Sequence, residues 1–257
     1  MIKFFRKIRY DLMEKNKIGK YLKYAIGEIV LVVIGILIAL SINNWNEKQK
    51  NKSKENQILT SLLTELISQK QQLGKQIKGD TITYLANDSL MVLSGSMNFN
   101  SIPTVDFSDL LYRIGVRTSF NPQSGTVEAL LSSGELDLIR NEALKIQLAG
   151  LKGRLDDYGE EDITIENFLE DQLNPYLRQK IPLYDQTDVD MTYKDSRKGN
   201  FLISNEQISS LLSDLYFNNL LGYGRYRYRV RAHEGRDLLA YYSNLAKLVK
   251  NELEKSD

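Results

Sequence analysis

Residues 25–42 form an apolar stretch, AIGEIVLVVIGILIALSI, in which Glu28 is the only charged residue. As a helix, these 18 residues are about 27 Å long, close to the ~30 Å hydrocarbon thickness of a bilayer. Aromatic residues that favour the membrane interface flank the stretch, with Tyr21 and Tyr24 before it and Trp45 after it. Few helices of soluble proteins are apolar on every face, so the stretch predicts a transmembrane helix rather than a buried core helix.

A cleavable signal peptide is the main alternative, because Ala39, Leu40 and Ser41 offer small residues at cleavage-like spacing. However, the apolar stretch exceeds the roughly 7–15 residues of a usual signal core, and the basic segment before it is long. We therefore expect an uncleaved anchor.

The basic residues predict the orientation of this anchor. Eight lysines and arginines precede the stretch, whereas four lysines follow it closely, at positions 48, 50, 52 and 54. Basic residues are retained on the cytoplasmic side, so we expect a cytoplasmic N-terminus and an extracytoplasmic C-terminal part. Residues 1–45 hold 8 of the 34 basic and 3 of the 33 acidic residues, so the remainder is mildly acidic, which argues against a nucleic-acid surface there.

Residues 1–24 form the basic segment on the cytoplasmic side. Within it, Phe5, Ile8 and Leu12 share one helical face, and basic residues surround them. This pattern is typical of a short helix on an anionic leaflet, although a positively charged tail that only directs insertion would look the same. We expect Gly19 to end this helix before the membrane segment begins.

Glu28 lies about one turn inside the predicted membrane segment, where a charged carboxylate is costly unless it is paired or close to water. It belongs to a helical stripe with Gly35 and Ala39, whose small side chains permit the close approach of a second helix. One hypothesis is therefore helix association in the membrane through Glu28, Gly35 and Ala39. The alternative is that Glu28 reaches the headgroups near Lys23.

The remaining residues, 43–257, predict a helical domain, since the sequence has only four prolines and is rich in leucine, lysine, glutamate and asparagine. The absence of cysteine excludes disulfides, thiolate nucleophiles and cysteine zinc sites. Leu59, Leu62, Leu66 and Leu73 occupy heptad a and d positions, and Gln69 and Gln76 occupy the other d positions of the same series. This short seam favours packing within the domain over a dimeric stalk. We expect the helix to leave the membrane and end near Gly74, and the further helices to cover about 81–93, 106–116, 127–131, 141–158, 205–221 and 223–254. The last two are either separate or continuous through Gly222 and Gly224. Gly134 should adopt the left-handed conformation after Ser132 and Ser133.

Two groups of residues invite a catalytic or metal-binding interpretation. Serines 132 and 133 lie beside a glycine, which invites a hydrolase interpretation. A Gly-x-Ser-x-Gly motif is absent and His233 is the only histidine, so a helix terminus that ends in serines and glycine explains these residues better. Residues 156–171 are strongly acidic, with apolar residues between the carboxylates, which favours a helix with a solvated acidic face. Calcium binding there lacks EF-hand spacing. A calcium-binding loop over Asp185–Asp195 stays as an alternative to a plain polar loop.

The segment Tyr223–Arg231, YGRYRYRVR, alternates aromatic and basic residues. On a strand it would form a single-stranded nucleic-acid platform. Leucines and tyrosines after it continue at helical spacing, so a helix is favoured. On a helix its four arginines either pair with the acidic 156–171 face or bind an anionic ligand or a partner. These arginines are Arg225, Arg227, Arg229 and Arg231.

Two blocks of the sequence resemble an uncharacterised family. The N-terminal block, MIKFFRKIR followed by GKYLKYAIGEIVLVVIGILIALSINNWNE, is similar to the start of a single-span membrane family common in Bacteroidota. Residues 120–144, FNPQSGTVEALLSSGELDLIRNEAL, are similar to a second segment of that family. The resemblance implies a bacterial inner-membrane protein with a helical periplasmic domain. It carries no catalytic or ligand-binding residue over to this chain.

Together these patterns predict an all-α protein whose single transmembrane helix, residues 25–42, continues into a periplasmic bundle of four or more helices. No constellation of residues identifies a reaction or a cofactor. The leading hypothesis is a non-enzymatic accessory, scaffold or sensor-like protein that contacts the lipid bilayer, binds a partner protein or small ligand, and does not bind nucleic acid. The alternatives are an envelope hydrolase that uses clustered carboxylates, and a subunit of a membrane transport or motility assembly.

Overall fold

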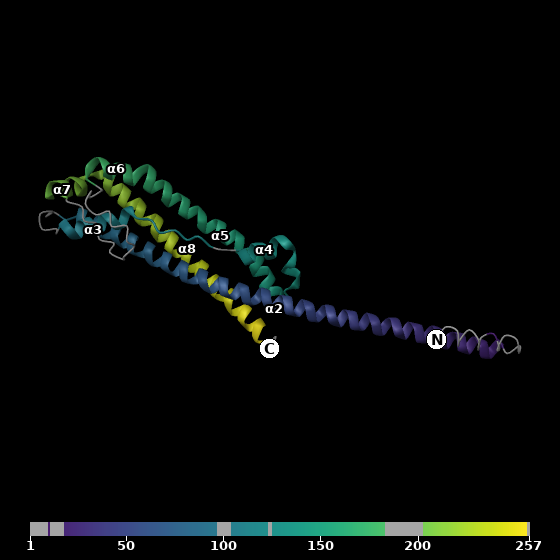
Figure 1. Ribbon diagram of the computed structural model, residues 1–257. Coiled ribbons are helices and arrows are strands. Elements are labelled where there is room, and N and C mark those ends of the chain that lie inside the picture. The colour runs from purple at the N-terminus through teal and green to yellow at the C-terminus, as the bar shows by residue number, and fades with distance from the viewer. Residues whose placement is uncertain (1–9, 11–17, 97–103, 123–124, 183–202, 256–257) are drawn as a thin grey trace. The chain divides into compact units, whose positions relative to one another are not determined.

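One long helix, α2, occupies the first third of the chain (Figure 1). The computed structural model describes residues 10, 18–96, 104–122, 125–182 and 203–255. These residues contain helices and no strand. The elements are α2 (Ile18–Ser94), α3 (Thr104–Gly115), α4 (Gly125–Ser133), the 3₁₀ turn η2 (Glu135–Leu138), α5 (Glu142–Phe168), the π-helical turn η3 (Leu169–Leu173), α6 (Asn174–Lys180), α7 (Asn205–Ser213) and α8 (Leu215–Glu254). The predicted all-α class is therefore confirmed for the described residues.

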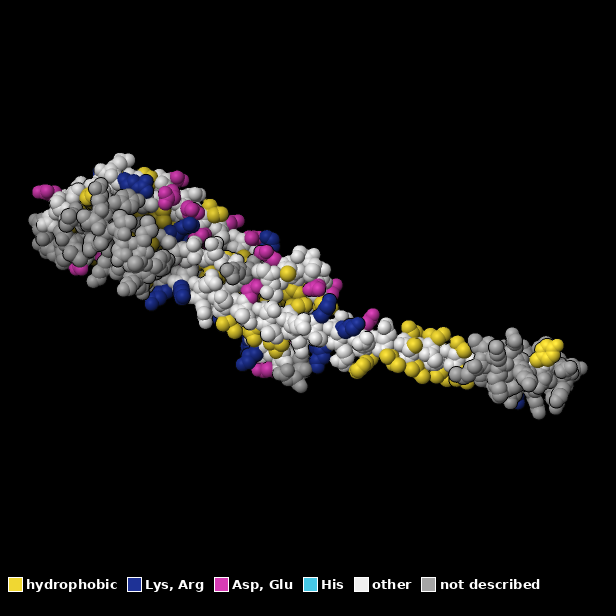
Figure 2. Space-filling view, in the orientation of Figure 1, with side chains coloured by type: hydrophobic (Ala, Val, Ile, Leu, Met, Phe, Trp, Pro, Cys, Tyr) yellow, Lys and Arg dark blue, Asp and Glu magenta, His cyan; other side chains and the backbone are white. Residues whose placement is uncertain are grey.

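The chain divides into two units, residues 1–57 and residues 58–257. In the first unit, α2 carries the apolar stretch, and none of the described side chains from 25 to 42 is buried. Ile29 and Leu31, for example, are 63% and 68% exposed. Figure 2 shows these hydrophobic side chains gathered around α2. By length and composition, this part of α2 could cross a membrane.

The second unit contains two apolar clusters. The first cluster joins the start of this unit's part of α2 with α4, α5 and the C-terminal half of α8, and it includes Leu62, Leu66, Leu148 and Leu245. The second cluster joins the end of α2 with α3, the end of α5, α6, α7 and the beginning of α8, and it includes Leu90, Phe107, Phe168, Leu211 and Phe217. Along α2, polar residues separate the two clusters.

The helix end predicted near Gly74 is wrong, because α2 continues through Gly74 to Ser94. Gly19 is the second residue of α2, and most of the helix that it was predicted to end lies outside the described residues. A glycine inside a helix costs only about 1 kcal/mol relative to alanine, which packing of the flanking leucines offsets. Gly79 has a packing role, because a Cβ there would lie 2.8 Å from the Thr118 Oγ1 atom.

The C-terminal helices also differ from the prediction. The helix is interrupted at Asp214, where the backbone is extended and the side chain accepts a hydrogen bond from the Tyr216 amide at 2.8 Å. Helix α8 therefore begins at Leu215, and it runs through Gly222 and Gly224, which was one of the two alternatives. Tyr176 strengthens the break, since its hydroxyl donates to Asp214 Oδ2 at 2.7 Å. A tertiary contact of this kind leaves no periodic signal in the sequence.

Several other helix ends follow local chemistry. Gly134 has φ 73°, as predicted, and ends the turn after α4 in the left-handed region. Asn141 caps α5 by accepting from the Leu144 amide, and α5 extends beyond the predicted Tyr158 to Phe168. Most of the short helix predicted within residues 1–24, most of the connection between the helices predicted over 81–93 and 106–116, and the loop Asp185–Asp195 lie outside the described residues.

Two glycines provide a matched test of this packing. In the structure, a Cβ at Gly235 would lie 2.9 Å from Ile77 Cγ1 and 3.4 Å from Tyr158 Cε2, whereas a Cβ at Gly74 meets nothing within 4 Å. Alanine gains about 1 kcal/mol of helix propensity at either site, but overpacking costs about 1–3 kcal/mol. We expect Gly74→Ala to raise the midpoint of thermal unfolding, measured by circular dichroism, and Gly235→Ala to lower it. An equal rise for both variants would contradict the close approach of α8 to α2.

Candidate functional site

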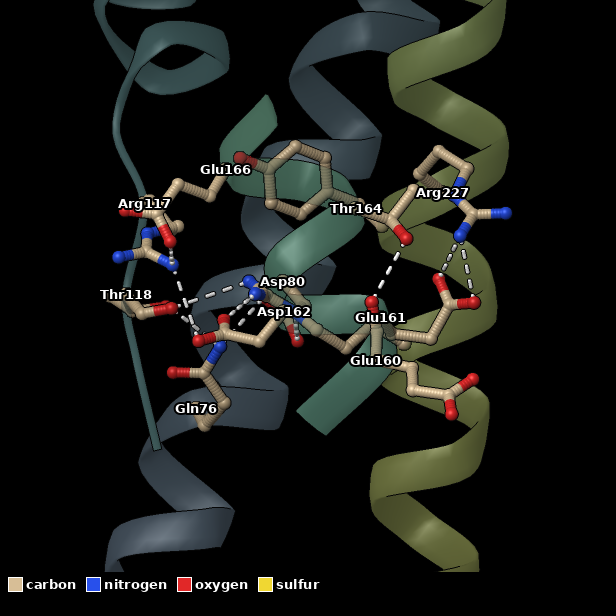
Figure 3. A network of polar contacts seen from close by, with 12 residues as sticks. Gln76, Asp80, Arg117, Thr118, Glu160, Glu161, Asp162, Thr164, Glu166 and Arg227 are labelled. Atoms are coloured by element: carbon tan, nitrogen blue, oxygen red, sulfur yellow. Dashed lines mark hydrogen bonds and ion pairs between the residues drawn. The ribbon is translucent and has the colours of Figure 1, made fainter. Parts of the chain in front are cut away.

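A layer of charged and amide side chains crosses the second unit between its two apolar clusters (Figure 3). We call it the polar layer and define it as Gln76, Asp80, Asp162 and Arg231 with the Thr118 carbonyl. The Arg231 side chain, from α8, is 0% exposed. Its Nε atom donates to Asp80 Oδ2 on α2 at 3.0 Å, its Nη2 atom donates to Asp80 Oδ1, and its Nη1 atom donates to Asp162 on α5. One guanidinium thus ties three helices together.

The polar layer also holds the non-helical connection between α3 and α4. The Thr118 carbonyl accepts from Gln76 Nε2 at 2.7 Å and from Arg231 Nη2 at 3.3 Å. The Val116 carbonyl accepts from the Tyr228 hydroxyl at 3.5 Å. Backbone carbonyls in this partly buried connection need such donors, because no helix supplies them. The layer therefore fixes both the helices and the segment that crosses them.

At the rim of the layer, more arginines pair with the acidic segment of α5. Arg117 Nη1 lies 3.2 Å from both Asp162 Oδ2 and Glu166 Oε2. Arg227 Nη2 lies 2.8 Å from Glu161 Oε1 and 2.7 Å from Glu161 Oε2. The carboxylates at 161, 162 and 166 are thus engaged by arginines rather than gathered around an open pocket.

Burial and pairing set the charge states within the layer. Burial raises the pKa of the Asp80 carboxyl, and Arg231 partly offsets this rise. Burial lowers the pKa of Arg231, but the hydrogen bonds from Arg231 to Asp80 more than compensate, so the net shift is upward. Both Asp80 oxygens accept from Arg231, and a protonated carboxyl could not accept in this bidentate way, so the pair is ionised. Burial also raises the pKa of the Tyr158 and Tyr228 hydroxyls, which keeps both neutral.

These contacts limit the chemistry that the layer can perform. The charged side chains of the layer form ion pairs with one another. The described residues contain no group of three or more His, Asp or Glu side chains that could hold a metal ion. A cavity of about 30 Å³ beside the layer, between Gly79, Tyr112 and Thr118, has room for a water molecule or two but not for a substrate. The geometry supports a structural clamp.

The arginines predicted as an anion or partner contact are separated by the structure. Segment 223–231 is helical, as predicted. Arg227 and Arg231 pair with the acidic segment, which was one of the two alternatives. Arg225 Nε instead lies 2.8 Å from Asp88 Oδ1 in an ion pair that is about two-fifths exposed, and Arg229 is exposed. A partner contact through Arg225 or Arg229 stays a prediction.

The predicted membrane-association residues belong to the first unit and take no part in the polar layer. Glu28 is partly exposed and Ala39 is exposed. A Cβ at Gly35 would meet nothing within 4 Å, so this face of α2 is open in the structure.

The polar layer itself was missed at the sequence level, although a signal exists. The heptad series that begins at Leu59 continues through Gln76 to three buried polar residues, Asp80, Thr83 and Asn87, and then to Leu90. The false break near Gly74 interrupted this series. Arg231, the partner of Asp80, lies 151 residues further along the chain, and residue spacing cannot predict such a distant pair.

The fold and the site define an all-helical protein with a buried ionic layer and one apolar helix long enough to span a membrane. The chain belongs to a family of unknown function (DUF6090), which matches residues 28–195. The matched range includes Asp80 and Asp162, whereas Arg231 lies beyond it. The predicted membership of an uncharacterised family is confirmed to this extent. No curated protein and no solved structure matches the chain.

One carboxylate beside the layer remains poorly satisfied. Glu234 is partly buried, and its Oε2 atom has no hydrogen-bond partner in the part of the chain that the structure describes. Burial raises the pKa of Glu234, and the neighbouring carboxylates Glu161 and Asp157 raise it further. Arg227 and His233 oppose this rise. The folded state therefore holds the Glu234 proton more tightly than the unfolded chain does.

This difference predicts a pH-dependent effect of Glu234→Gln. A raised pKa in the folded state means that Glu234 destabilises the fold increasingly as pH rises from the unfolded value of about 4.5 through the folded one. We expect the variant to unfold at a higher temperature than the natural protein at about pH 7 and at the same temperature at about pH 3.5. Glu160→Gln, an exposed position on α5, is the control for loss of charge alone. A gain that is equal at both pH values would contradict this interpretation.

Proposed function

We propose that this chain is a single-span protein of a bacterial inner membrane, of a Bacteroidota type, that serves as a non-enzymatic accessory, scaffold or sensor-like protein. In this proposal residues 1–24 are cytoplasmic, residues 25–42 cross the membrane, and residues 43–257 form a periplasmic helical bundle. The bundle binds a partner protein or small ligand.

The observation that carries this proposal is the exposure of the apolar part of α2. None of the described side chains from 25 to 42 is buried, although all but a few are aliphatic. Exposed apolar surface costs about 25 cal/mol per Å² in water. The continuous apolar surface around residues 25–42 therefore requires an apolar environment in place of water. Lipid supplies that environment along the full length of such a helix. Trp45, 64% exposed, suits the interface at its end.

The charges near the anchor support the orientation. Basic residues are more numerous before the apolar stretch than directly after it. Because lysines and arginines favour the cytoplasmic side, this difference supports a cytoplasmic N-terminus.

The engaged carboxylates favour a non-enzymatic role. General acid–base catalysis needs a carboxyl group that a substrate can reach. In the acidic segment, Glu161, Asp162 and Glu166 pair with arginines, and Asp156 pairs with Lys152 at 3.4 Å. The segment's other four carboxylates are exposed on the helix surface, and none of the eight lines the small cavity beside the polar layer. Binding of a partner is then the role that remains for the exposed helical faces, together with association in the membrane through Glu28, Gly35 and Ala39.

A topology experiment tests the proposal. We expect the full chain to stay in the membrane fraction after alkaline carbonate washing, and a C-terminal alkaline phosphatase fusion, active only outside the cytosol, to be active. Replacing Val32 and Ile36 with arginine should release the protein, because each arginine in mid-span costs about 2.5–3.5 kcal/mol of insertion.

Val92→Arg is the matched control, because Val92 is 71% exposed on the same helix but lies in the second unit. It should leave the fractionation unchanged. A natural chain that is recovered in the soluble fraction, or a C-terminal fusion that is inactive, would contradict the proposal.

A further inference from the structure

The exposed face of α2 in the second unit has few charges. Between residues 58 and 94, eleven residues of α2 are exposed, and only Lys75 and Lys78 among them are charged. The exposed face of α5 provides a comparison, because seven of its fourteen exposed residues are charged. From 60 to 71, six residues of α2 are exposed and none of them is charged: Thr60, Ser61, Thr64, Ile67, Ser68 and Gln71. Glu65 and Lys70 are partly buried at the edges of this face. Depletion of charge is a feature of the centres of protein interfaces rather than of free surface.

These residues also follow the spacing of a helix-pairing seam. Thr60, Thr64, Ile67 and Gln71 are separated by four, three and four residues, as are the a and d positions of a coiled coil. Ile67, at the centre, is 47% exposed. The buried heptad series Leu59, Leu62 and Leu66 lies on the other side of the helix, within the first apolar cluster. Helix α2 thus carries two seams, and the described chain covers one of them.

A long hollow lies beside the uncovered seam, between α2 and the start of α4, and shares Thr60 and Thr64 with it. It has a volume of about 700 Å³, and its wall on α2 runs from Thr60 to Gln72, about 18 Å along the axis, with Gly125 and Thr126 opposite. Glu65 is the only charged residue in this lining, and its carboxylate accepts from the Thr126 amide at 2.8 Å at the start of α4. Since that charge is already engaged, the hollow presents a neutral, hydroxyl-rich surface with the length of several helical turns.

We propose that two copies of this chain associate in parallel through this face, with α2 residues 60–71 of one copy against the same residues of the other. A neutral face is compatible with itself, because a symmetric pair places each residue near its own counterpart without bringing like charges together. The small side chains permit close approach of the second helix. Beyond Gln71 the next exposed residues, Lys75 and Lys78, would repel their counterparts, which ends the contact.

This inference rests on the proposed membrane anchor, which fixes the parallel orientation. A seam with one isoleucine among hydroxyl and amide side chains is weak for a pair that diffuses freely in water. Two copies confined to one membrane meet at a much higher effective concentration, which a weak contact then turns into a stable pair.

Disulfide trapping tests the contact in cells that produce the full chain. The natural sequence has no cysteine, so each introduced cysteine is unique. We expect Ile67→Cys and Gln71→Cys to form disulfide-linked dimers on mild oxidation of membranes, several-fold more than Ser89→Cys. Ser89 is exposed on the same helix but lies beyond the two lysines. Equal yields at 67 and 89, or a product containing a different protein, would overturn the pairing of two copies.

A charge exchange separates loss of pairing from loss of folding. In chains that carry Gln71→Cys, we expect Ile67→Lys alone and Ile67→Glu alone each to lower the dimer yield several-fold. Co-production of the two variants should restore it as the mixed dimer, which an unfolded variant could not give. Failure of restoration would contradict the parallel register. Carbonate washing of the same membranes tests the anchor, so a chain that is anchored but not cross-linked overturns this inference alone.

Discussion

The buried charge of Arg231 is the constraint on which the helical unit depends. Moving a guanidinium out of water costs several kcal/mol even after relaxation, so it must bring partners with it. Asp80 and Asp162 supply opposite charges from α2 and α5, and the Thr118 carbonyl supplies a further acceptor. These partners come from three parts of the chain, which means that α2, α5, α8 and the connection over 116–120 must all be in place at once. Apolar contacts alone would tolerate sliding of these helices, whereas a bidentate pair does not.

The position of the layer explains why the core is divided. Leucines pack above and below it, and the polar residues between them follow the same heptad series on α2, from Gln76 to Asn87. Because the charges of Arg231, Asp80 and Asp162 pair with one another, the exposed helix faces are the features left for function. Of these, the apolar surface over 25–42 and the neutral face of α2 over 60–71 differ most from ordinary surface. Both are faces of α2, and both are suited to contact rather than catalysis.

Helical periodicity and local caps were readable from the sequence, and they predicted the all-α class, the apolar helix and the left-handed Gly134. The errors arose where tertiary contacts override local preference. The helix end predicted near Gly74 does not occur, since α2 packs continuously there and Gly79 lies against Thr118, and the break at Asp214 depends on Tyr176. The pairing of Arg227 and Arg231 with the acidic segment was foreseen as one alternative. Asp80 was not, because a pair separated by 151 residues has no signature in a single sequence.

A double-mutant cycle on Asp80 and Arg231 tests the central claim most directly. The free energies of unfolding of Asp80→Asn, Arg231→Met and the double variant are compared with that of the natural chain. If Arg231 clamps the helices through Asp80, each single variant loses about 3–5 kcal/mol and the double variant loses at least ~2 kcal/mol less than their sum. The reference pair is Arg225 with Asp88, whose side chains are 42% and 43% exposed and whose coupling should stay below about 1 kcal/mol. Additive losses at Asp80 and Arg231 would contradict the account.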